Sequence, residues 1–217
     1  MKREFAFYLG AIVALFILLL AWLYANPGLP TYQPTDATVV KVVLKQGHGS
    51  GVSIGGGYVL TAAHVVKGVN KVTLKTKDGK TREADVLWAN TDYDVALLRT
   101  SDTKLEAASL DCRIAPEGAS IISYGNPLQV EFAAAYGRIA GSPRKFGPWH
   151  SVFVTDITTV MGQSGGPVFD EGGKLIGLTV GVMGAPMGFS MTLVGYGFVV
   201  PSRTVCDLLA RPDGGAV

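Results

Sequence analysis

The chain has 217 residues, 48% of them apolar, and a formal net charge of +2 from 19 basic and 17 acidic residues. This length and apolar share fit one mid-sized globular domain plus an appendage. The small net charge, without any long run of Lys and Arg, argues against a nucleic-acid partner. The 28 glycines, many beside short β-branched stretches, favour an all-β domain with tight turns.

The N-terminal stretch Phe5–Tyr24 is apolar, carries no charge and is long enough to cross a bilayer as one helix. Basic residues precede it and the next one along the chain is Lys41, so the positive-inside rule predicts a cytoplasmic N-terminus. We therefore expect residues 1–25 to be a single-pass transmembrane anchor, with the folded domain on the periplasmic or extracellular side. A cleaved signal peptide is the alternative, but it usually has a shorter apolar stretch and a small residue where Leu23 stands.

Residues 26–37 are rich in proline and lack an apolar period, which predicts an extended linker before a folded domain at 38–217. Short β-branched stretches separated by Gly, Asp or Asn turns then predict two groups of strands, which we expect to form two antiparallel barrels at about 38–112 and 118–201. The predicted strands are Thr38–Lys45, Gly51–Leu60, Lys71–Thr76, Ala84–Ala89, Val95–Thr100, Ala119–Tyr124, Val130–Ala140, Val152–Thr155, Pro167–Phe169, Leu175–Gly181 and Gly195–Val200.

The C-terminal segment is the one place in the domain where apolar residues follow a helical period. Val205, Leu208 and Leu209 have this spacing, and Ser202 is a suitable N-cap. We expect a helix at about 202–210.

Hydrolysis of an amide at neutral pH needs a nucleophile, a base, a partner that orients the base, and donors for the oxyanion. Ser164 lies in a glycine-flanked turn, Met161–Pro167, where backbone N–H groups can converge on one anion. Ser164 is the candidate nucleophile, and the N–H groups of Gly162 and Ser164 are the candidate oxyanion hole. An ordinary Gly-Ser turn is the alternative.

His64 is the candidate base, because it follows a predicted strand and has small neighbours that leave room for an imidazole. A structural histidine is the alternative. His48 and His150 have no comparable setting and are expected to be turn residues, although His48 could line the cleft. Asp94 is the preferred partner of His64 because it directly precedes a buried strand, and Asp92 is its rival.

These segments, in the order His, Asp, Ser, resemble the trypsin-like serine proteases of the chymotrypsin fold; the motifs are TAAHVV, DVALL and GQSGGP. Within that superfamily the chain is most similar to the HtrA/Do-like proteases, through Gly49–Val52, Thr155-Asp156 and Gly195–Ser202. The resemblance covers most of residues 38–210. It implies two six-stranded barrels with the active site between them, and a serine endopeptidase that cleaves polypeptides without a metal or other cofactor.

The resemblance also implies how substrates bind. The base of the primary pocket falls near Thr158, and without a carboxylate there we expect apolar residues at the cleavage position. The segment Thr179–Val182, that is Thr179, Val180, Gly181 and Val182, is expected to pair with an extended substrate backbone. Do-like proteases often form homotrimers, which makes a trimer the candidate assembly, although the sequence marks no interface.

Two departures from that family qualify the prediction. The chain ends about fifteen residues beyond Ser202, so no PDZ domain is expected. Val160-Met161 replaces the usual Asn-Pro before the oxyanion glycine, which leaves the shape of that loop open. A protease fold that has lost turnover and only binds peptides at the membrane is the main rival hypothesis. Cys112 and Cys206 could form a disulfide in an oxidising compartment or remain two buried thiols.

Overall fold

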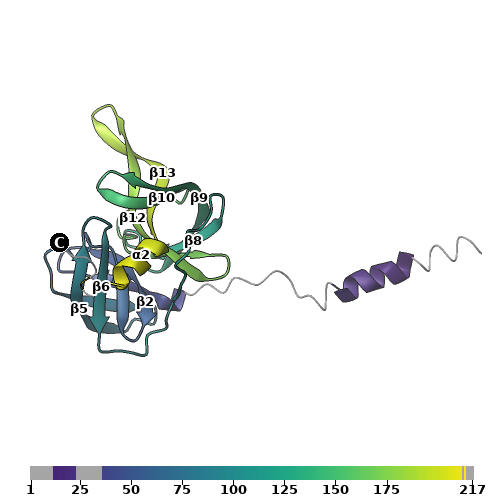
Figure 1. Cartoon of the computed structure of the whole chain (residues 1–217), viewed down its shortest axis with the longest axis horizontal. Coiled ribbons are helices and arrows are strands. Elements are labelled where there is room, and N and C mark those ends of the chain that lie inside the picture. Colours follow the sequence, from purple (N-terminus) through teal and green to yellow (C-terminus); the bar gives the residue numbers. More distant parts are fainter. Residues whose placement is uncertain (1–11, 23–35, 212, 214–217) are drawn as a thin grey trace, which may run out of the picture. The chain divides into compact units, whose positions relative to one another are not determined.

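The N-terminal half of the folded domain forms a closed antiparallel barrel in the computed structural model, which describes residues 12–22, 36–211 and 213. Its strands follow the order β1-β2-β3-β6-β5-β4 around the barrel. They are β1 (Val39–Val43), β2 (His48–Gly55), β3 (Tyr58–Thr61), β4 (Lys71–Thr76), β5 (Thr81–Asn90) and β6 (Val95–Thr100), preceded by the 3-10 turn η1 (Asp36–Thr38). Figure 1 labels β2, β5 and β6 of this barrel. The predicted first barrel is confirmed.

Alternating burial explains why these sequences form barrel strands. In β4, Val72 and Leu74 are buried, whereas Lys71, Thr73 and Lys75, which alternate with them, are less buried. A strand with one side facing the core requires this period of two. The inward residues of the other strands join them in one cluster that includes Val40, Val59 and Leu98. The core of this half is therefore made of Val, Ala and Leu side chains.

The stretch predicted as one strand, Gly51–Leu60, is two strands joined by a turn, so that prediction is wrong. Gly55, Gly56 and Gly57 all have positive φ angles, of 91°, 61° and 83°. Glycine adopts this conformation without the steric cost that a side chain brings. The three glycines reverse the chain, and β3 then pairs antiparallel with β2.

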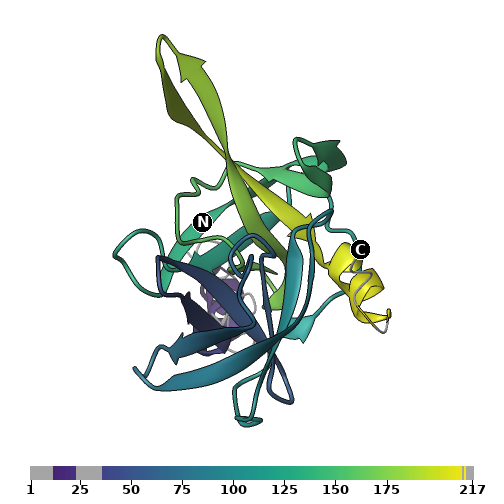
Figure 2. The ribbon, with the colours of Figure 1, turned by 90° about the vertical axis from the view of Figure 1, so that its left-hand side faces the viewer.

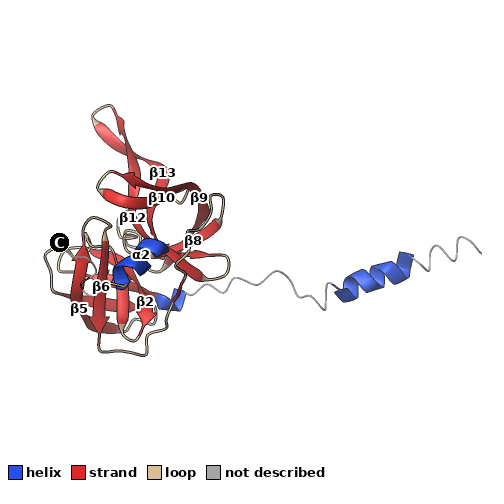
Figure 3. Cartoon of the chain, in the orientation of Figure 1, coloured by secondary structure: helices blue, strands red, loops and turns tan. Residues whose placement is uncertain are grey.

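The C-terminal half is a seven-stranded sheet in the order β11-β8-β9-β10-β13-β12-β7, with β11 also paired to β12. That extra pairing closes a ring of six strands, and β7 adds to β12 in parallel outside the ring. The strands are β7 (Ser109–Leu110), β8 (Ser120–Gly125), β9 (Ala133–Phe146), β10 (Trp149–Thr155), β11 (Pro167–Asp170), β12 (Lys174–Met187) and β13 (Ser190–Pro201). Figure 3 shows the two halves as strand-rich bodies with little helix.

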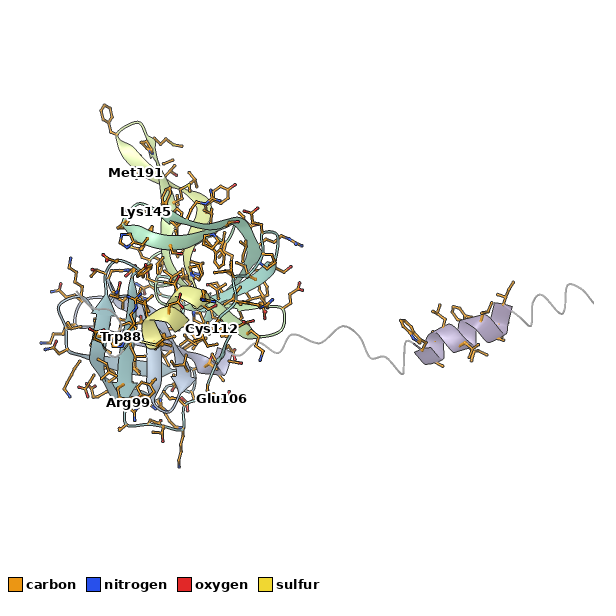
Figure 4. All side chains as sticks on the ribbon, in the orientation of Figure 1. Trp88, Arg99, Glu106, Cys112, Lys145 and Met191 are labelled. Atoms are coloured by element: carbon orange, nitrogen blue, oxygen red, sulfur yellow. A yellow bond between two sulfur atoms is a disulfide. The ribbon has the colours of Figure 1, made fainter. Side chains whose placement is uncertain are left out.

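The β12–β13 hairpin is longer than the sequence predicted. The strands pair as far as Met187 and Ser190, beyond the predicted ends at Gly181 and Gly195. Gly184 and Pro186 weaken the local strand signal, which explains the underestimate. The hairpin projects from the body of the domain (Figure 2), and Met191 near its tip is exposed (Figure 4).

The predicted C-terminal helix is present as α2 (Ser202–Leu209), packed against β12 and β13. Pro201 occupies the N-cap position, so the prediction of Ser202 as the cap is wrong; the Ser202 hydroxyl instead donates to the carbonyl of Asp111. Cys206 of α2 forms a disulfide with Cys112, with 5.9 Å between the two Cα atoms. The disulfide therefore joins the segment between the two halves to the terminal helix, close to where Figure 4 labels Cys112.

The predicted membrane segment is only partly described. Residues 12–22 are helical and the remainder of Phe5–Tyr24 lies outside the described residues. In the part of the chain that the structure describes, no helix combines the length and apolarity needed to cross a membrane. The linker prediction for residues 26–37 also lies almost wholly outside the described ranges.

Candidate active site

His64 and Asp94 are in direct contact, as the sequence predicted for a base and its partner. His64 follows β3 in a tight turn, and Asp94 is the residue before β6, the strand that pairs with β3. The ring atom Nδ1 of His64 lies 2.7 Å from Asp94 Oδ2, and the backbone N–H of His64 donates to Asp94 Oδ1 at 2.9 Å. Because a carboxylate only accepts, Nδ1 carries the proton and Nε2 is left as the proton acceptor.

The backbone of Asp94 is in the left-handed region, with φ of 58°. Asp and Asn tolerate this conformation better than most residues. The carboxylate is buried, with Asp94 only 5% exposed, whereas the side chain of the rival Asp92 is 53% exposed. The nearest ring nitrogen to Asp92 is Nδ1 of His150, at 3.8 Å. Asp94, and not Asp92, is therefore the partner of His64.

The turn that carries Ser164 is held against both barrels by its backbone. The carbonyl of Ser164 accepts from the N–H of Ser50 in β2 at 2.8 Å, and the N–H of Gly165 donates to the carbonyl of Thr179 in β12 at 2.6 Å. Gly165 has φ of 83°, and a Cβ added there would lie 2.3 Å from Thr61 Oγ1. A glycine is therefore required where this turn approaches the segment just before His64.

The two predicted oxyanion donors are free. Among the described residues, no atom accepts a hydrogen bond from the N–H of Gly162 or of Ser164. The carbonyls that share a peptide with these N–H groups are both bonded: Met161 accepts from the N–H of Leu128 at 2.8 Å and Gln163 accepts from the N–H of Gly166 at 2.9 Å, which fixes the direction of the two donors. The carbonyl of Gly162 accepts from Ser50 Oγ at 2.7 Å and ties the same turn to the first barrel. Free, fixed N–H groups beside a serine can stabilise an oxyanion.

The loop before Gly162, whose shape the sequence left open, is fixed by hydrogen bonds to its neighbours. The carbonyl of Met161 accepts from the N–H of Leu128 at 2.8 Å. The N–H of Val160 donates to Gln163 Oε1 at 2.7 Å. Gln163 is buried, so this bond is shielded from water.

His64 and Ser164 lie on adjacent segments but do not share a hydrogen bond in the part of the chain that is described. Gly49 lies between the residue after His64 and the backbone of Ser164. A Cβ added at Gly49 would lie 2.6 Å from Val65 Cγ1 and 3.2 Å from the carbonyl oxygen of Ser164. Contacts between base and nucleophile are often long without substrate. The structure thus brings together His64 and Asp94 directly, and Ser164 through the packing of neighbouring segments.

His48 supports the nucleophile turn. Its Nε2 lies 2.8 Å from the carbonyl oxygen of Asn126, and a Cβ added at Gly162 would come within 2.6 Å of the same Nε2. Gly162 also has φ of 93°. His48 therefore packs behind the oxyanion glycine, a position that the sequence did not predict.

The residues predicted to bind substrate fall into two groups. Thr158 is exposed in the loop after β10, and Gly181 and Val182 pair with β13. Thr179 is buried, and its backbone N–H and carbonyl are both used by Gly166 and Gly165 of the nucleophile turn. The prediction that Thr179 pairs with substrate is therefore wrong, because its backbone groups already support the turn.

A cleft of about 720 Å³ lies beside His64 and Asp94, and the sequence did not predict it. Its lining is mainly apolar and comes from the turn after His64, from β5, and from Pro148 and Trp149 of the second half. The indole Nε1 of Trp149 donates to Asp94 Oδ2 at 3.1 Å. No sequence signal marks Trp149, because it lies outside all three motifs and opens an ordinary strand.

Comparison with known proteins adds independent information. The trypsin-like peptidase domain family matches residues 49–178. The chain is 31% identical over 181 residues to Protease Do-like 1, chloroplastic, of Arabidopsis thaliana, covering 78% of this chain and 40% of that protein. It is 32% identical over 165 residues to the periplasmic pH-dependent serine endoprotease DegQ of Escherichia coli K12, covering 73% of this chain and 35% of that protein.

Solved structures give the same fold. The Rv3671c protease of M. tuberculosis H37Rv, in an inactive form, superposes with a TM-score of 0.69 at 28% identity, covering 81% of this chain and 89% of that one. The HtrA-type protease AlgW with a tripeptide gives a TM-score of 0.72 at 24% identity, covering 83% and 63% of the two chains. This chain spans well under half the length of the two curated relatives above. The matched domain covers more than half of the chain, which therefore belongs to the trypsin-like peptidase family.

Proposed function

We propose that this protein is a serine endopeptidase in which His64, Asp94 and Ser164 form the catalytic triad. The observation that carries the proposal is the buried Asp94 carboxylate bonded to His64 Nδ1 at 2.7 Å, next to a serine turn with two free N–H donors. Family membership supports the same chemistry.

In the proposed reaction, Ser164 Oγ attacks the carbonyl carbon of the scissile peptide while His64 Nε2 takes the hydroxyl proton. The N–H groups of Gly162 and Ser164 stabilise the oxyanion, and Asp94 stabilises the imidazolium. His64 then gives its proton to the leaving amine, which departs and leaves an acyl-enzyme. Water hydrolyses this ester by the same base and restores the serine.

A fluorophosphonate probe tests the nucleophile, since it reacts with an activated serine and leaves others unlabelled. We expect the wild-type protein to be labelled and to cleave denatured casein, and Ser164→Ala to lose both properties. Ser101→Ala, at an exposed serine just beyond the end of β6 opposite to Asp94, is the matched control and should behave like wild type. Labelling that survives Ser164→Ala would show that another residue is the nucleophile.

The same experiment separates the enzyme from a peptide-binding module. The absence of a hydrogen bond between His64 and Ser164 in the described side chains is the one observation that favours a silent site. A silent module would bind casein peptides without labelling or cleavage.

Substrate preference is the next part of the proposal. We expect small or medium apolar residues at the cleavage position, because Thr158 offers no carboxylate to pair with Lys or Arg. The backbone of Val180–Val182 is expected to pair with the extended substrate. A cleavage-site profile on a denatured proteome tests both points, and Thr158→Asp should shift the preference towards Lys and Arg.

We also propose that residues 1–25 anchor the protein in a membrane, with the protease domain on the periplasmic or extracellular side. The uncharged stretch Phe5–Tyr24 supports the anchor, and the disulfide Cys112–Cys206 supports an oxidising compartment for the domain. Carbonate extraction should leave the protein in the membrane fraction. Recovery of soluble protein with a mature N-terminus near Asn26 would instead indicate a cleaved signal peptide.

A further inference from the structure

Trp149 places its indole between the two barrels, next to the His64–Asp94 pair. It is the first residue of β10 and pairs with Phe146 across the turn at Gly147-Pro148. Its ring lies 5.3 Å from the ring of Phe198 in β13, and Phe146 stacks on the same Phe198 at 4.5 Å. Three aromatic rings of the second barrel therefore form one cluster, and the indole N–H extends from it to Asp94.

Gly181 of β12 provides the space that this indole needs. A Cβ added at Gly181 would lie 2.5 Å from Cη2 and 2.8 Å from Cζ2 of Trp149. Carbon atoms of neighbouring side chains do not approach so closely, so any side chain at this position would displace the ring. The position of the indole is thus set by two neighbours, the ring of Phe198 and the backbone of Gly181, which are paired across β13 and β12.

Two of the hydrogen bonds to the Asp94 carboxylate come from His64 of the first barrel, and another comes from the second barrel. Oδ1 accepts from the backbone N–H of His64, and Oδ2 accepts from His64 Nδ1. The third donor is Trp149 Nε1, at 3.1 Å from Oδ2. Hydrogen bonds to a buried, ionised carboxylate are stronger than those between neutral groups.

This third bond links the pair His64–Asp94, which belongs to the first barrel, to the barrel that carries Ser164. We propose that Trp149 is a positioning residue: its indole N–H fixes the Asp94 carboxylate, and through it the His64 ring, relative to the second barrel and the nucleophile. The inference rests on the proposed serine endopeptidase function. Trp149 itself does not touch the reacting atoms in this mechanism.

The sharpest test replaces one atom. Incorporation of 3-benzothienylalanine at position 149 puts sulfur in place of the N–H and keeps the shape of the side chain, and Trp149→Phe is the simpler variant. We expect kcat for a quenched casein substrate to fall about 10- to 100-fold in both, the range that corresponds to a lost hydrogen bond to a charged group. KM should change less than about two-fold for the benzothienyl protein, because the cleft wall is retained.

Phe146→Leu is the matched control. It disturbs the same aromatic cluster through Phe198 but removes no bond to Asp94, so kcat should stay close to wild type. If the benzothienyl protein keeps wild-type kcat, or if Phe146→Leu lowers kcat as much as the benzothienyl substitution does, the positioning role is wrong.

Proton NMR gives a readout that does not require turnover. The Nδ1 proton of His64, shared with Asp94, should give a far-downfield signal that broadens or is lost in the benzothienyl protein and persists in Phe146→Leu. An unchanged signal in the benzothienyl protein would overturn the inference. A wild-type protein that shows the signal but is not labelled by fluorophosphonate would instead refute the proposed function, so the two failures are distinguishable.

Gly181→Ala provides a second route to the same contact. It should push the indole away without removing its N–H, and lower kcat by a similar factor. Because both changes break one interaction, Gly181→Ala combined with Trp149→Phe should lower kcat little more than Trp149→Phe alone. Fully multiplicative effects on kcat would show that the two residues act separately and would contradict the proposal.

Discussion

Both members of the His64–Asp94 pair belong to the first barrel, and Asp94 receives one further hydrogen bond from Trp149 of the second barrel, whereas Ser164 lies on a second-barrel turn whose shape depends on the first. Asp94 accepts from both the backbone and the ring of His64, and all of these groups lie beside β3 and β6. The nucleophile turn, in contrast, needs the N–H and the hydroxyl of Ser50 from β2. A change at Ser50 should therefore affect the nucleophile turn and its oxyanion donors more than it affects the His64–Asp94 pair.

The largest effect should come from breaking the His64–Asp94 pair itself. Asp94→Asn retains the size of the side chain, and Asn tolerates the positive φ of 58° at this position. Its amide cannot hold His64 in the tautomer that accepts from serine, so we expect kcat to fall about 10³- to 10⁴-fold. Measurement of kcat on casein checks this.

Asp92→Asn is the control for that experiment. The side chain of Asp92 is exposed, and the ion pair that it forms among the described residues is with His150 and not with His64, so its neutralisation should change kcat less than about two-fold. A larger loss with Asp92→Asn than with Asp94→Asn would reverse the assignment of the triad.

Ser50→Ala should break the dependence of the second barrel on the first. Ser50 is fully buried; its hydroxyl donates to the carbonyl of Gly162 at 2.7 Å and accepts from the N–H of Asn126 at 2.9 Å. Its removal leaves buried groups unpaired, which costs about 1–3 kcal/mol of unfolding free energy each. We expect kcat to fall about 10²-fold as the oxyanion donors lose their alignment.

Ser53→Ala is the matched control, since Ser53 is equally buried in the same strand but accepts only a long bond of 3.4 Å from Gly55. It should leave kcat near the wild-type value. The downfield Nδ1 signal of His64 should persist in Ser50→Ala, because the bonds of Ser50 go to Gly162, Asn126, Thr61 and Ser164 and not to the His64–Asp94 pair. Its loss would contradict the division between the barrels drawn above.

Removal of the disulfide Cys112–Cys206 frees the segment between the barrels from α2 without changing a residue of the candidate active site. Cys112 and Cys206 close a loop with a sequence separation of 94, and a bond of this kind stabilises a protein by about 3 kcal/mol. In Cys112→Ser combined with Cys206→Ser, the melting temperature should fall by about 6–12 °C. Cleavage well below that temperature should stay within about two-fold of wild type.

Thermal unfolding of the wild type with and without reductant is the control, because reduction should produce the same shift and leave the double variant unchanged. A double variant that melts at the wild-type temperature but does not cleave would show that the disulfide acts on the active site and not on stability.

The chemistry-bearing motifs could be predicted from the sequence because each is short and local. The neighbours in sequence indicate the role of each residue. His64 has small neighbours after a strand, Asp94 directly precedes an apolar strand, and Ser164 lies in a glycine-flanked turn. Both barrels and α2 followed from the apolar patterns, and the extra strand break at Gly55–Gly57 was missed because three consecutive glycines lie inside an otherwise continuous strand pattern.

The contacts that connect distant segments could not be predicted. Thr179 lies in a segment that was expected to pair with substrate, yet its backbone N–H and carbonyl are bonded to the nucleophile turn. Trp149 meets Asp94 across a sequence separation of 55. Such pairings depend on how two barrels pack, and no periodic pattern in a single sequence records that packing. The Cys112–Cys206 pairing stayed open for the same reason.

The smallest expected effect concerns a charged link between the barrels. Glu131, in the loop between β8 and β9, accepts from Lys75 Nζ of β4 at 2.7 Å and from Lys41 Nζ of β1 at 2.9 Å. These two ammonium groups, Lys75 foremost, hold the pKa of Glu131 below its usual value of 4.5. A carboxyl whose pKa is lowered by folding stabilises the protein at pH values above the usual pKa, and this contribution is lost as the pH falls through the lowered pKa.

In urea unfolding at pH 7, Glu131→Gln should therefore lower the free energy of unfolding by about 0.5–1 kcal/mol, since the ion pairs are partly exposed. At pH 3 the difference from wild type should shrink, and 1 M salt at pH 7 should reduce it as well. Glu106→Gln, at an exposed carboxyl without an ion pair among the described residues, should show neither dependence. A Glu131→Gln protein whose stability differs from wild type equally at both pH values would show that the residue acts through packing, and that the barrels are joined at this point by shape and not by charge.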